Sequence, residues 1–341
     1  MPVSILYIGN KLAAKGFTPT GMEILCPLLE KEGYTVYTAS DKVFPLLRML
    51  DMLLHVMRLR NKVQVVLIDV YSSSAFYYAY CIARLCRVIG MPYITILRGG
   101  NLPHRMKRSR GMCNSIFKHS MHNIALSAYM QLAMARNNYN CELIPNSITL
   151  ANYPYKNRSS ISVAMLWVRS FHAVYNPQMA IRLLHALIEK YPDAHLTMVG
   201  PDKDRCLAEC QQLAKELGIT EKVRFTGLLT KKEWVSLAAN HDIFINTTDF
   251  DNMPISLIEA MATGLPVVST NVGGIPSLVT HGVNGLLVEK NDLTAMHSSV
   301  EYLMQNSETA AELGKQGRAT AENFDWNVVK VKWINILNSI S

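Results

Sequence analysis

Short apolar runs alternate with segments of helical periodicity along almost the whole chain, and no other feature limits the fold as strongly. Near-continuous apolar runs are typical of parallel strands that are buried on both faces. Strands and helices in alternation give a doubly wound parallel sheet. The strands predicted for the first half are residues 3–8, 35–39, 63–70, 93–97, 123–127 and 142–144. The helices predicted between them include residues 21–32, 74–89 and 128–137.

The alternation breaks once, at the polar and irregular residues 152–160, and then resumes. The second series has predicted strands at 161–168, 195–199, 223–226, 243–246, 266–270 and 285–288, and helices at 177–190, 203–217, 231–239 and 254–263. We therefore expect an α/β protein of two Rossmann-like domains, residues 1–153 and 160–325, whose doubly wound parallel sheets face a shared ligand-binding cleft. An amphipathic helix at 326–341 is expected to pack back on the first domain.

Composition agrees with two globular domains and excludes several classes of protein. The chain has 341 residues, of which 49% are hydrophobic and 18% charged, so a disordered chain is excluded. Its seven cysteines form no C-x-x-C pair, which indicates reduced thiols rather than a disulfide framework or a zinc ribbon. Residues 1–9 are strand-like and lack a basic leader pattern, and no apolar run reaches 18 residues. We therefore expect a cytoplasmic protein.

Positive charge is concentrated in the first half of the chain. Residues 1–155 carry 17 Lys and Arg against 7 Asp and Glu, whereas residues 156–341 carry 17 against 19. Such an excess favours an anionic partner, which is nucleic acid, an acidic membrane surface or a phosphate-bearing substrate. Because the chain has no helix-turn-helix, zinc-finger or RNA-binding signature, we do not expect nucleic acid to be the partner.

Residues 41–62 predict a helix with one narrow polar stripe. The stripe consists of Arg48, Asp51, His55, Arg58 and Lys62, and nearly every other position from 46 to 59 is apolar. Two interpretations remain open: a helix buried in the core or at a domain interface, and an interfacial helix that contacts a membrane. A second basic cluster at 104–110 favours peripheral contact with an anionic membrane, although a solvated loop has the same pattern.

The most informative window is residues 249–279, where two acids lie eight positions apart. Pro254 lies between Asp251 and Glu259 and opens a helix. The N–H groups of the next three residues, Ile255, Ser256 and Leu257, are expected to be free at the positive end of that helix, facing an anion. Glu259, in the second turn, can reach a pair of hydroxyls such as those of a ribose. The pattern predicts a site for a diphosphate-linked sugar.

This window resembles the signature of glycosyltransferase family 4, the retaining GT-B enzymes: an acid, seven residues, and a Glu followed by Ala, Met, Ala and a nearby Gly. The resemblance covers nearly the whole chain. Its other parts are a Gly loop at 16–21, the run 144–147, Arg169, and the segments 199–200, 223–227, 273–276 and 282–285.

The resemblance implies a role for each matching residue. Glu259 would hold the nucleotide ribose, Asp251 would contact the donor sugar, and Arg169 would neutralise the diphosphate, so that neither a metal ion nor another cofactor is needed. Backbone groups near Gly200 and Gly227 would read the base. Sugar hydroxyls and the diphosphate would be held by the segment that follows Asp251, which is Asn252, Met253, Pro254, Ile255 and Ser256.

The chain departs from the family pattern at two positions. The lysine expected five residues after Arg169 is replaced by Val174, and Arg98 stands where the family has a histidine. Since arginine is no base at neutral pH, we hypothesise that Arg98 stabilises the departing diphosphate, which makes Arg98, Arg169 and Asp251 the candidate catalytic residues. The glycines expected to approach acceptor or phosphate, or simply to form turns, are Gly16, Gly21, Gly99 and Gly100.

The resemblance predicts a retaining glycosyltransferase. Its donor would be a nucleotide-diphosphate sugar, and its acceptor a lipid-linked or polysaccharide-precursor glycan of bacterial surface-glycan synthesis, bound mainly by the first domain at the inner face of the cell membrane. Two alternatives remain: a sugar-nucleotide epimerase of the same fold, and a non-catalytic paralogue that only binds a nucleotide sugar. A dinucleotide dehydrogenase is disfavoured because no strand is followed by G-x-G-x-x-G. The donor base, the sugar and the acceptor are left open.

Overall fold

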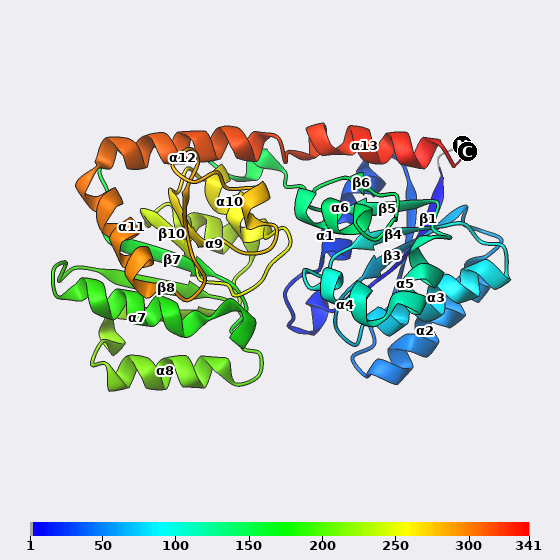
Figure 1. Cartoon of the computed structure of the whole chain (residues 1–341), viewed down its shortest axis with the longest axis horizontal. Helices are drawn as coiled ribbons and strands as arrows, with labels where there is room; N and C mark the ends of the chain where they lie inside the picture. The colour runs from blue at the N-terminus through cyan, green and yellow to red at the C-terminus, as the bar shows by residue number, and fades with distance from the viewer. Residues whose placement is uncertain (1–2, 341) are drawn as a thin grey trace. The chain divides into compact units, whose positions relative to one another are not determined.

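The computed structural model describes residues 3–340. The chain folds into two compact units: unit 1 comprises Met1–Ser147 and Trp326–Ser341, and unit 2 comprises Ile148–Asp325 (Figure 1). The boundary thus precedes the irregular residues 152–160. Those residues pack on unit 2 through Arg158, whose buried guanidinium donates to the carbonyls of Ala238, His241 and Thr263.

Unit 1 is built on a six-stranded parallel sheet in the order β2-β1-β3-β4-β5-β6. The strands are β1 (Ser4–Ile8), β2 (Thr35–Ala39), β3 (Val65–Val70), β4 (Tyr93–Leu97), β5 (His122–Ala125) and β6 (Glu142–Leu143). The helices are α1 (Gly21–Lys31), α2 (Pro45–Leu59), α3 (Phe76–Val88), α4 (Leu102–Arg108), α5 (Arg110–Phe117), α6 (Ala128–Ala135) and α13 (Trp326–Asn338). The strand order reverses between β1 and β3, which is where this kind of sheet opens a crevice at its carboxyl edge.

Unit 2 repeats the design with a second six-stranded parallel sheet, in the order β12-β11-β10-β7-β8-β9. Its strands are β7 (Ala164–Val168), β8 (His195–Val199), β9 (Val223–Gly227), β10 (Ile243–Asn246), β11 (Val267–Thr270) and β12 (Leu286–Val288). Its helices are α7 (Pro177–Ile188), α8 (Cys206–Glu216), α9 (Lys231–Ala238), α10 (Ile255–Ala262), α11 (Leu293–Gln305) and α12 (Ser307–Glu322). Here the order reverses between β7 and β10.

The apolar runs form the central strands for the reason that the sequence suggested. Every residue of β3, β4, β10 and β11 is buried, because helices cover both faces of each sheet (Figure 1). The two-unit, doubly wound fold predicted from the sequence is confirmed. All seven cysteines are free, and burial raises the pKa of the Cys86 and Cys210 thiols to about 12.

Four helices in unit 1 differ from the expectation or add to it. The basic residues 104–110 lie in α4 and at the start of α5 rather than in a solvated loop, since Leu102 and Met106 anchor α4 in the core. Helix α2 is not a core helix, because it buries only Arg48, Met52 and Val56. Helix α13 packs within unit 1, where Lys330 and the Trp326 indole both donate to Glu32.

Candidate functional site

Two predicted site residues of unit 2, Arg169 and Asp251, lie where its strand order reverses. Arg169 directly follows β7, and Asp251 lies in the loop that follows β10. The Arg169 guanidinium donates to Asp251 Oδ2, and the Asn252 N–H donates to Oδ1 at 2.7 Å. The side chains of Arg169 and Asp251 are 14% and 15% exposed, so the pair is partly buried but still within reach of a ligand.

Arg169 is held in place but keeps an unused donor. Its guanidinium stacks on the Tyr175 ring at 4.9 Å, and its Nε is buried without a hydrogen-bond partner among the described residues. Its carbonyl faces Gly200 so closely that a Cβ there would lie 1.8 Å from the oxygen. Gly200 therefore serves first to let two strand ends approach each other, and its N–H donates to the Gly227 carbonyl at 2.8 Å.

A second glycine pair shapes the Asp251 loop. A Cβ on Gly273 would lie 1.9 Å from the Asp251 carbonyl, and the Gly274 N–H donates to the same oxygen at 3.0 Å. Glycine is required here for two reasons: it has no Cβ to meet the carbonyl, and its φ of +56° lies in the left-handed region. The run at 273–276, which the sequence analysis cited only as part of the resemblance, thus fixes the backbone that carries Asp251.

Helix α10 presents its positive end to this loop. The helix begins at Ile255, one residue later than predicted, because Pro254 is its N-cap rather than its first residue. The N–H groups of Ile255 and Ser256 have no hydrogen-bond partner among residues 3–340. The expectation of a third free N–H was wrong, because Leu257 donates to the Pro254 carbonyl at 3.2 Å. The Ser256 Oγ is also buried and unpartnered, so α10 offers several unsatisfied groups to an anion.

Glu259 is buried in the second turn of α10, with 2% exposure, and two groups contact its carboxylate. The Tyr153 hydroxyl donates to Oε1 at 2.7 Å, and the Lys231 ammonium donates to the same oxygen. Burial raises the pKa of Tyr153, so its hydroxyl remains a donor. Nothing in the sequence joined these residues to Glu259, since they lie 106 and 28 positions away.

Lys231 is the functional candidate that sequence reasoning missed. It is the first residue of α9, which begins with a capping box of Thr230 and Glu233. Its side chain is 50% exposed, its ammonium contacts Glu259, and burial lowers the pKa of Lys231 to about 8. The available signal was a lysine directly after an N-cap threonine in the short loop between β9 and α9, because helix starts that follow a strand are where such folds contact ligands.

In unit 1, Arg98 lies just beyond β4 in a closed network at the carboxyl edge of the sheet. Its guanidinium donates to Asp69 at 2.9 Å, to the Tyr7 hydroxyl at 2.8 Å and to the Asn146 side chain at 2.7 Å. The side chains of Arg98 and Asp69 are 8% and 0% exposed. Burial alone would lower the pKa of Arg98, but nearby Tyr7 and Asp69 outweigh it and raise the pKa. Its contact with a departing diphosphate stays a prediction.

The candidate glycines of unit 1 have different surroundings. A Cβ on Gly21 would lie 2.2 Å from the Arg98 guanidinium, and one on Gly99 would lie 2.3 Å from the Ser72 nitrogen. Both glycines therefore allow close packing around the Arg98 network. Gly16 ends a short 3-10 helix with φ +82° and has open space where a side chain would be, while Gly100 lies in the turn after β4.

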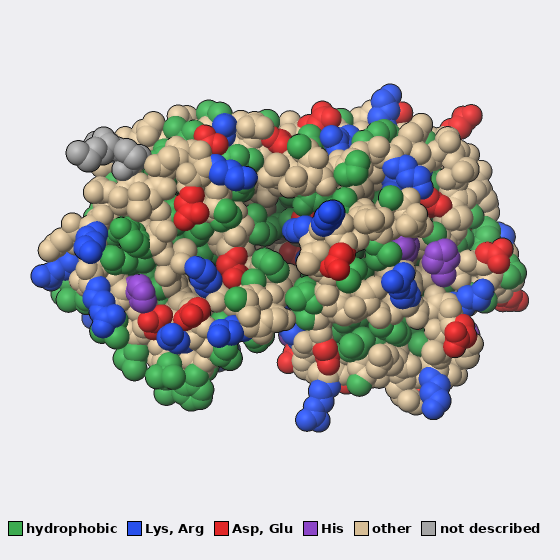
Figure 2. All heavy atoms as spheres, turned by 180° about the vertical axis from the view of Figure 1, so that it is seen from behind, with side chains coloured by type: hydrophobic (Ala, Val, Ile, Leu, Met, Phe, Trp, Pro, Cys, Tyr) green, Lys and Arg blue, Asp and Glu red, His purple; other side chains and the backbone are tan. Residues whose placement is uncertain are grey.

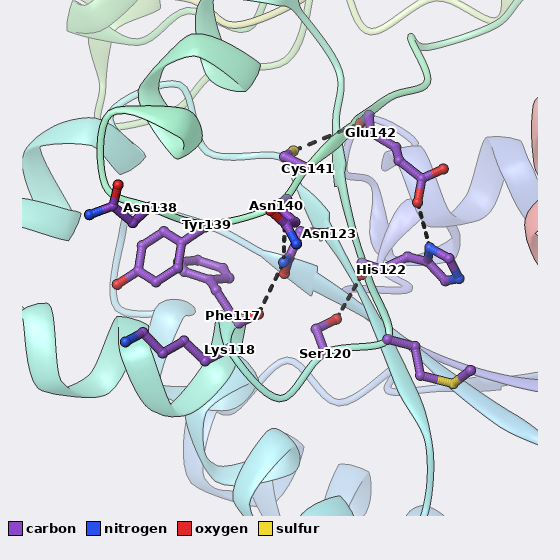
Figure 3. A pocket seen from close by; sticks show the side chains of 11 residues that line it. Phe117, Lys118, Ser120, His122, Asn123, Asn138, Tyr139, Asn140, Cys141 and Glu142 are labelled. Carbon is purple, nitrogen blue, oxygen red and sulfur yellow. Dashed lines mark hydrogen bonds and ion pairs between the residues drawn. The ribbon is translucent and has the colours of Figure 1, made fainter.

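A cavity of about 570 Å³ in unit 1 lies at the opposite edge of the sheet. Figure 3 shows that the segments entering β5 and β6 line it, including Lys118, His122, Asn138 and Glu142. Several of its polar groups already pair with one another, as where His122 contacts Glu142 at 2.5 Å. Because this is the amino edge of the strands, we do not assign the nucleotide site to it.

Residues 161–320 match the family model described as glycosyl transferases group 1. D-inositol 3-phosphate glycosyltransferase of Corynebacterium efficiens is 31% identical over 154 residues, which cover 44% of this chain and 36% of that protein. A GDP-mannose-dependent phosphatidylinositol monomannoside mannosyltransferase of Mycolicibacterium smegmatis is 31% identical over 168 residues, which cover 47% of this chain and 44% of that protein.

The similarity of structure extends further along the chain. Anabaena HepE, solved in complex with UDP-glucose, superposes with a TM-score of 0.83 over 99% of this chain and 100% of its own, at 17% identity. The curated relatives match only over part of their own length. The fold is that of the GT-B glycosyltransferases, and the family match falls on the unit that carries Arg169, Asp251 and Glu259. The segment that matches the glycosyl transferases group 1 model, residues 161–320, thus lies wholly within unit 2.

Proposed function

We propose that the protein is a retaining glycosyltransferase that takes its sugar from a nucleoside-diphosphate sugar bound by unit 2. The observation that carries the proposal is the cluster at the strand-order reversal of unit 2. There, Arg169 pairs with Asp251, and the Asp251 loop leads into α10, which carries unsatisfied groups at its start and Glu259 in its second turn. All of these residues lie in the segment that matches the group 1 family model. Such a reversal at the carboxyl edge is where doubly wound sheets bind nucleotides.

The diphosphate is proposed to lie in front of α10. Its oxygens would accept hydrogen bonds from the Ile255 and Ser256 N–H groups, the Ser256 hydroxyl and Arg169 Nε, all of which lack partners within residues 3–340. A helix N-terminus and a guanidinium both donate hydrogen bonds to phosphate oxygens, and here the fold holds both in place before the diphosphate binds. We propose that these groups neutralise the diphosphate without a metal ion.

The ribose is proposed to bind Glu259, beside Lys231. In the ligand-free chain the ammonium neutralises a carboxylate that would otherwise be buried alone. When a nucleotide binds, the ribose hydroxyls donate to Glu259, and Lys231 remains next to it as a second cation. We propose that it supplies the positive charge that Val174 cannot.

Asp251 is proposed to orient the donor sugar. Its carboxylate is fixed by Arg169 and the Asn252 N–H, and its backbone is fixed by the 273–274 glycines. In a retaining front-side transfer the leaving phosphate accepts the acceptor proton, so no protein base is required. Unit 1 is proposed to bind the acceptor, a lipid-linked or polysaccharide-precursor glycan, at the cytoplasmic face of a bacterial membrane.

A thermal-shift screen against UDP-, GDP-, ADP- and dTDP-sugars tests the donor proposal. A ligand at about a hundred times its Kd stabilises the native state by roughly 2.7 kcal/mol, which for a domain of this size raises Tm by about 5 to 10 °C. We expect one nucleotide to give this shift, and a flat response to every donor would overturn the proposal.

Products formed from the stabilising donor separate the alternatives. Slow release of free nucleotide with a sugar of unchanged anomeric configuration, read by NMR, supports a retaining transferase. Formation of an epimeric nucleotide sugar would instead identify an epimerase. Binding without any turnover, even with candidate acceptors present, would identify a non-catalytic binding protein.

A further inference from the structure

Helix α2 carries a row of large apolar side chains on its exposed side. We call this row the α2 surface and define it as Phe44, Leu46, Leu47, Leu50, Leu54 and Met57. Leu46, Leu50 and Leu54 are 70%, 55% and 49% exposed and lie one helical turn apart. In Figure 2 hydrophobic side chains gather at the end of unit 1 that α2 occupies in Figure 1.

The opposite side of α2 shows that this exposure is built into the fold. Arg48, Met52 and Val56 face the core, and the Arg48 guanidinium donates to the carbonyls of Lys42 and Val43 and to the Asn10 side chain. A cation of the predicted polar stripe is therefore fixed inside while leucines face outward. In a helix that faces only water, exposing the arginine and burying the leucines would give the lower free energy.

The charges around the α2 surface indicate the chemistry of what covers it. Arg58, Arg60 and Lys62 are exposed at its carboxyl end. The same helical layer continues through α3 to α5, next to which Lys107, Arg108 and Arg110 are also exposed. Residues 1–155 as a whole carry 17 cationic against 7 acidic side chains. An apolar row bordered by cations complements acyl chains beneath anionic headgroups.

We propose that the α2 surface inserts into the headgroup boundary of an anionic phospholipid membrane, with α2 lying along the plane of the bilayer. None of the helices within residues 3–340 is long and apolar enough to cross a membrane, so the contact is one of surface insertion. The proposal deepens the membrane location given above. It does not depend on transferase activity, since it concerns unit 1 alone.

Vesicle co-sedimentation of the full chain tests the proposal. We expect binding to phosphatidylglycerol-containing vesicles at low salt, weaker binding at high salt, and little binding to pure phosphatidylcholine. The Leu50→Glu/Leu54→Glu variant should bind about 100-fold more weakly, at about tenfold for each leucine. The Arg58→Gln/Lys62→Gln variant should lose about fivefold for each cation.

The matched control is Leu132→Glu on α6, which changes an equally exposed leucine outside the α2 surface and should bind like the wild type. Nucleotide-induced thermal shifts should persist in all variants, which separates failed docking from a misfolded chain or a wrong donor proposal. Two results would overturn the proposal: unchanged vesicle binding by the leucine variant, and a wild-type dimer that becomes monomeric in it, because a second copy would then cover the surface.

Discussion

Each unit has one arginine paired with one carboxylate at the carboxyl edge of its sheet, and the two pairs differ in how complete they are. In unit 1 the Arg98–Asp69 pair is enclosed, and Tyr7 and Asn146 accept further hydrogen bonds from Arg98. In unit 2 the Arg169–Asp251 pair is more exposed, and Arg169 Nε has no partner among the described residues.

The difference indicates a division of tasks. A closed network stabilises one arrangement of the chain, and removing one member leaves a buried charge alone. An incomplete network retains donors that a ligand can satisfy, at some cost to the stability of the free protein. We therefore expect substitutions at Arg98 to act mainly on folding, and those at Arg169 mainly on donor binding.

The largest expected effect is that of Arg98→Ala on stability. Because Asp69 would be left fully buried without its counter-charge, the free energy of unfolding of unit 1 should fall by about 3 to 5 kcal/mol. Urea unfolding measures the change. The Arg98→Met/Asp69→Asn double variant should recover part of the loss. A loss below about 1 kcal/mol in Arg98→Ala would show that the network does not hold unit 1 together.

Arg169→Ala should lower donor affinity strongly and stability only slightly. It removes charge-assisted hydrogen bonds of roughly 1.5 to 3 kcal/mol to the diphosphate, so nucleotide affinity should fall about 10- to 100-fold. Isothermal titration with the nucleotide identified in the screen measures the loss. Unfolding should shift much less than in Arg98→Ala, because this pair can still be reached by water. Intact affinity would remove Arg169 from the donor site.

The smallest expected effect concerns Lys231 and appears as a pH dependence. Burial lowers its pKa to about 8, so the ammonium loses its proton as pH rises through that value and donor affinity should decrease above it. Lys231→Met should bind the nucleotide several-fold more weakly at pH 7 and show no such decrease. Lys232→Met, at the exposed neighbouring position, is the control. A decrease that persists in Lys231→Met would assign the titration to another group.

Much of the fold could be read from the sequence, because apolar runs and breaks are local signals. The strands at 35–39, 93–97, 195–199 and 243–246 were predicted with the boundaries that the structure has. Helix α4 was missed, since Gly99, Gly100 and Pro103 are the usual marks of a loop. Of the site, Arg169, Asp251 and the start of α10 were singled out together, but Lys231 and Tyr153 were not, because their contact with Glu259 is made only by the packed chain.

By itself the sequence determined the two-unit α/β architecture, the identity of the acids and arginines, and the amphipathic period of α2. All of these depend on the order of residues along the chain. Tertiary structure decided which arginine is enclosed and which keeps a free donor, and which side of α2 faces outward. The reason is physical: burial, pairing and the loss of water around a charge depend on neighbours in space, and a linear pattern does not specify these.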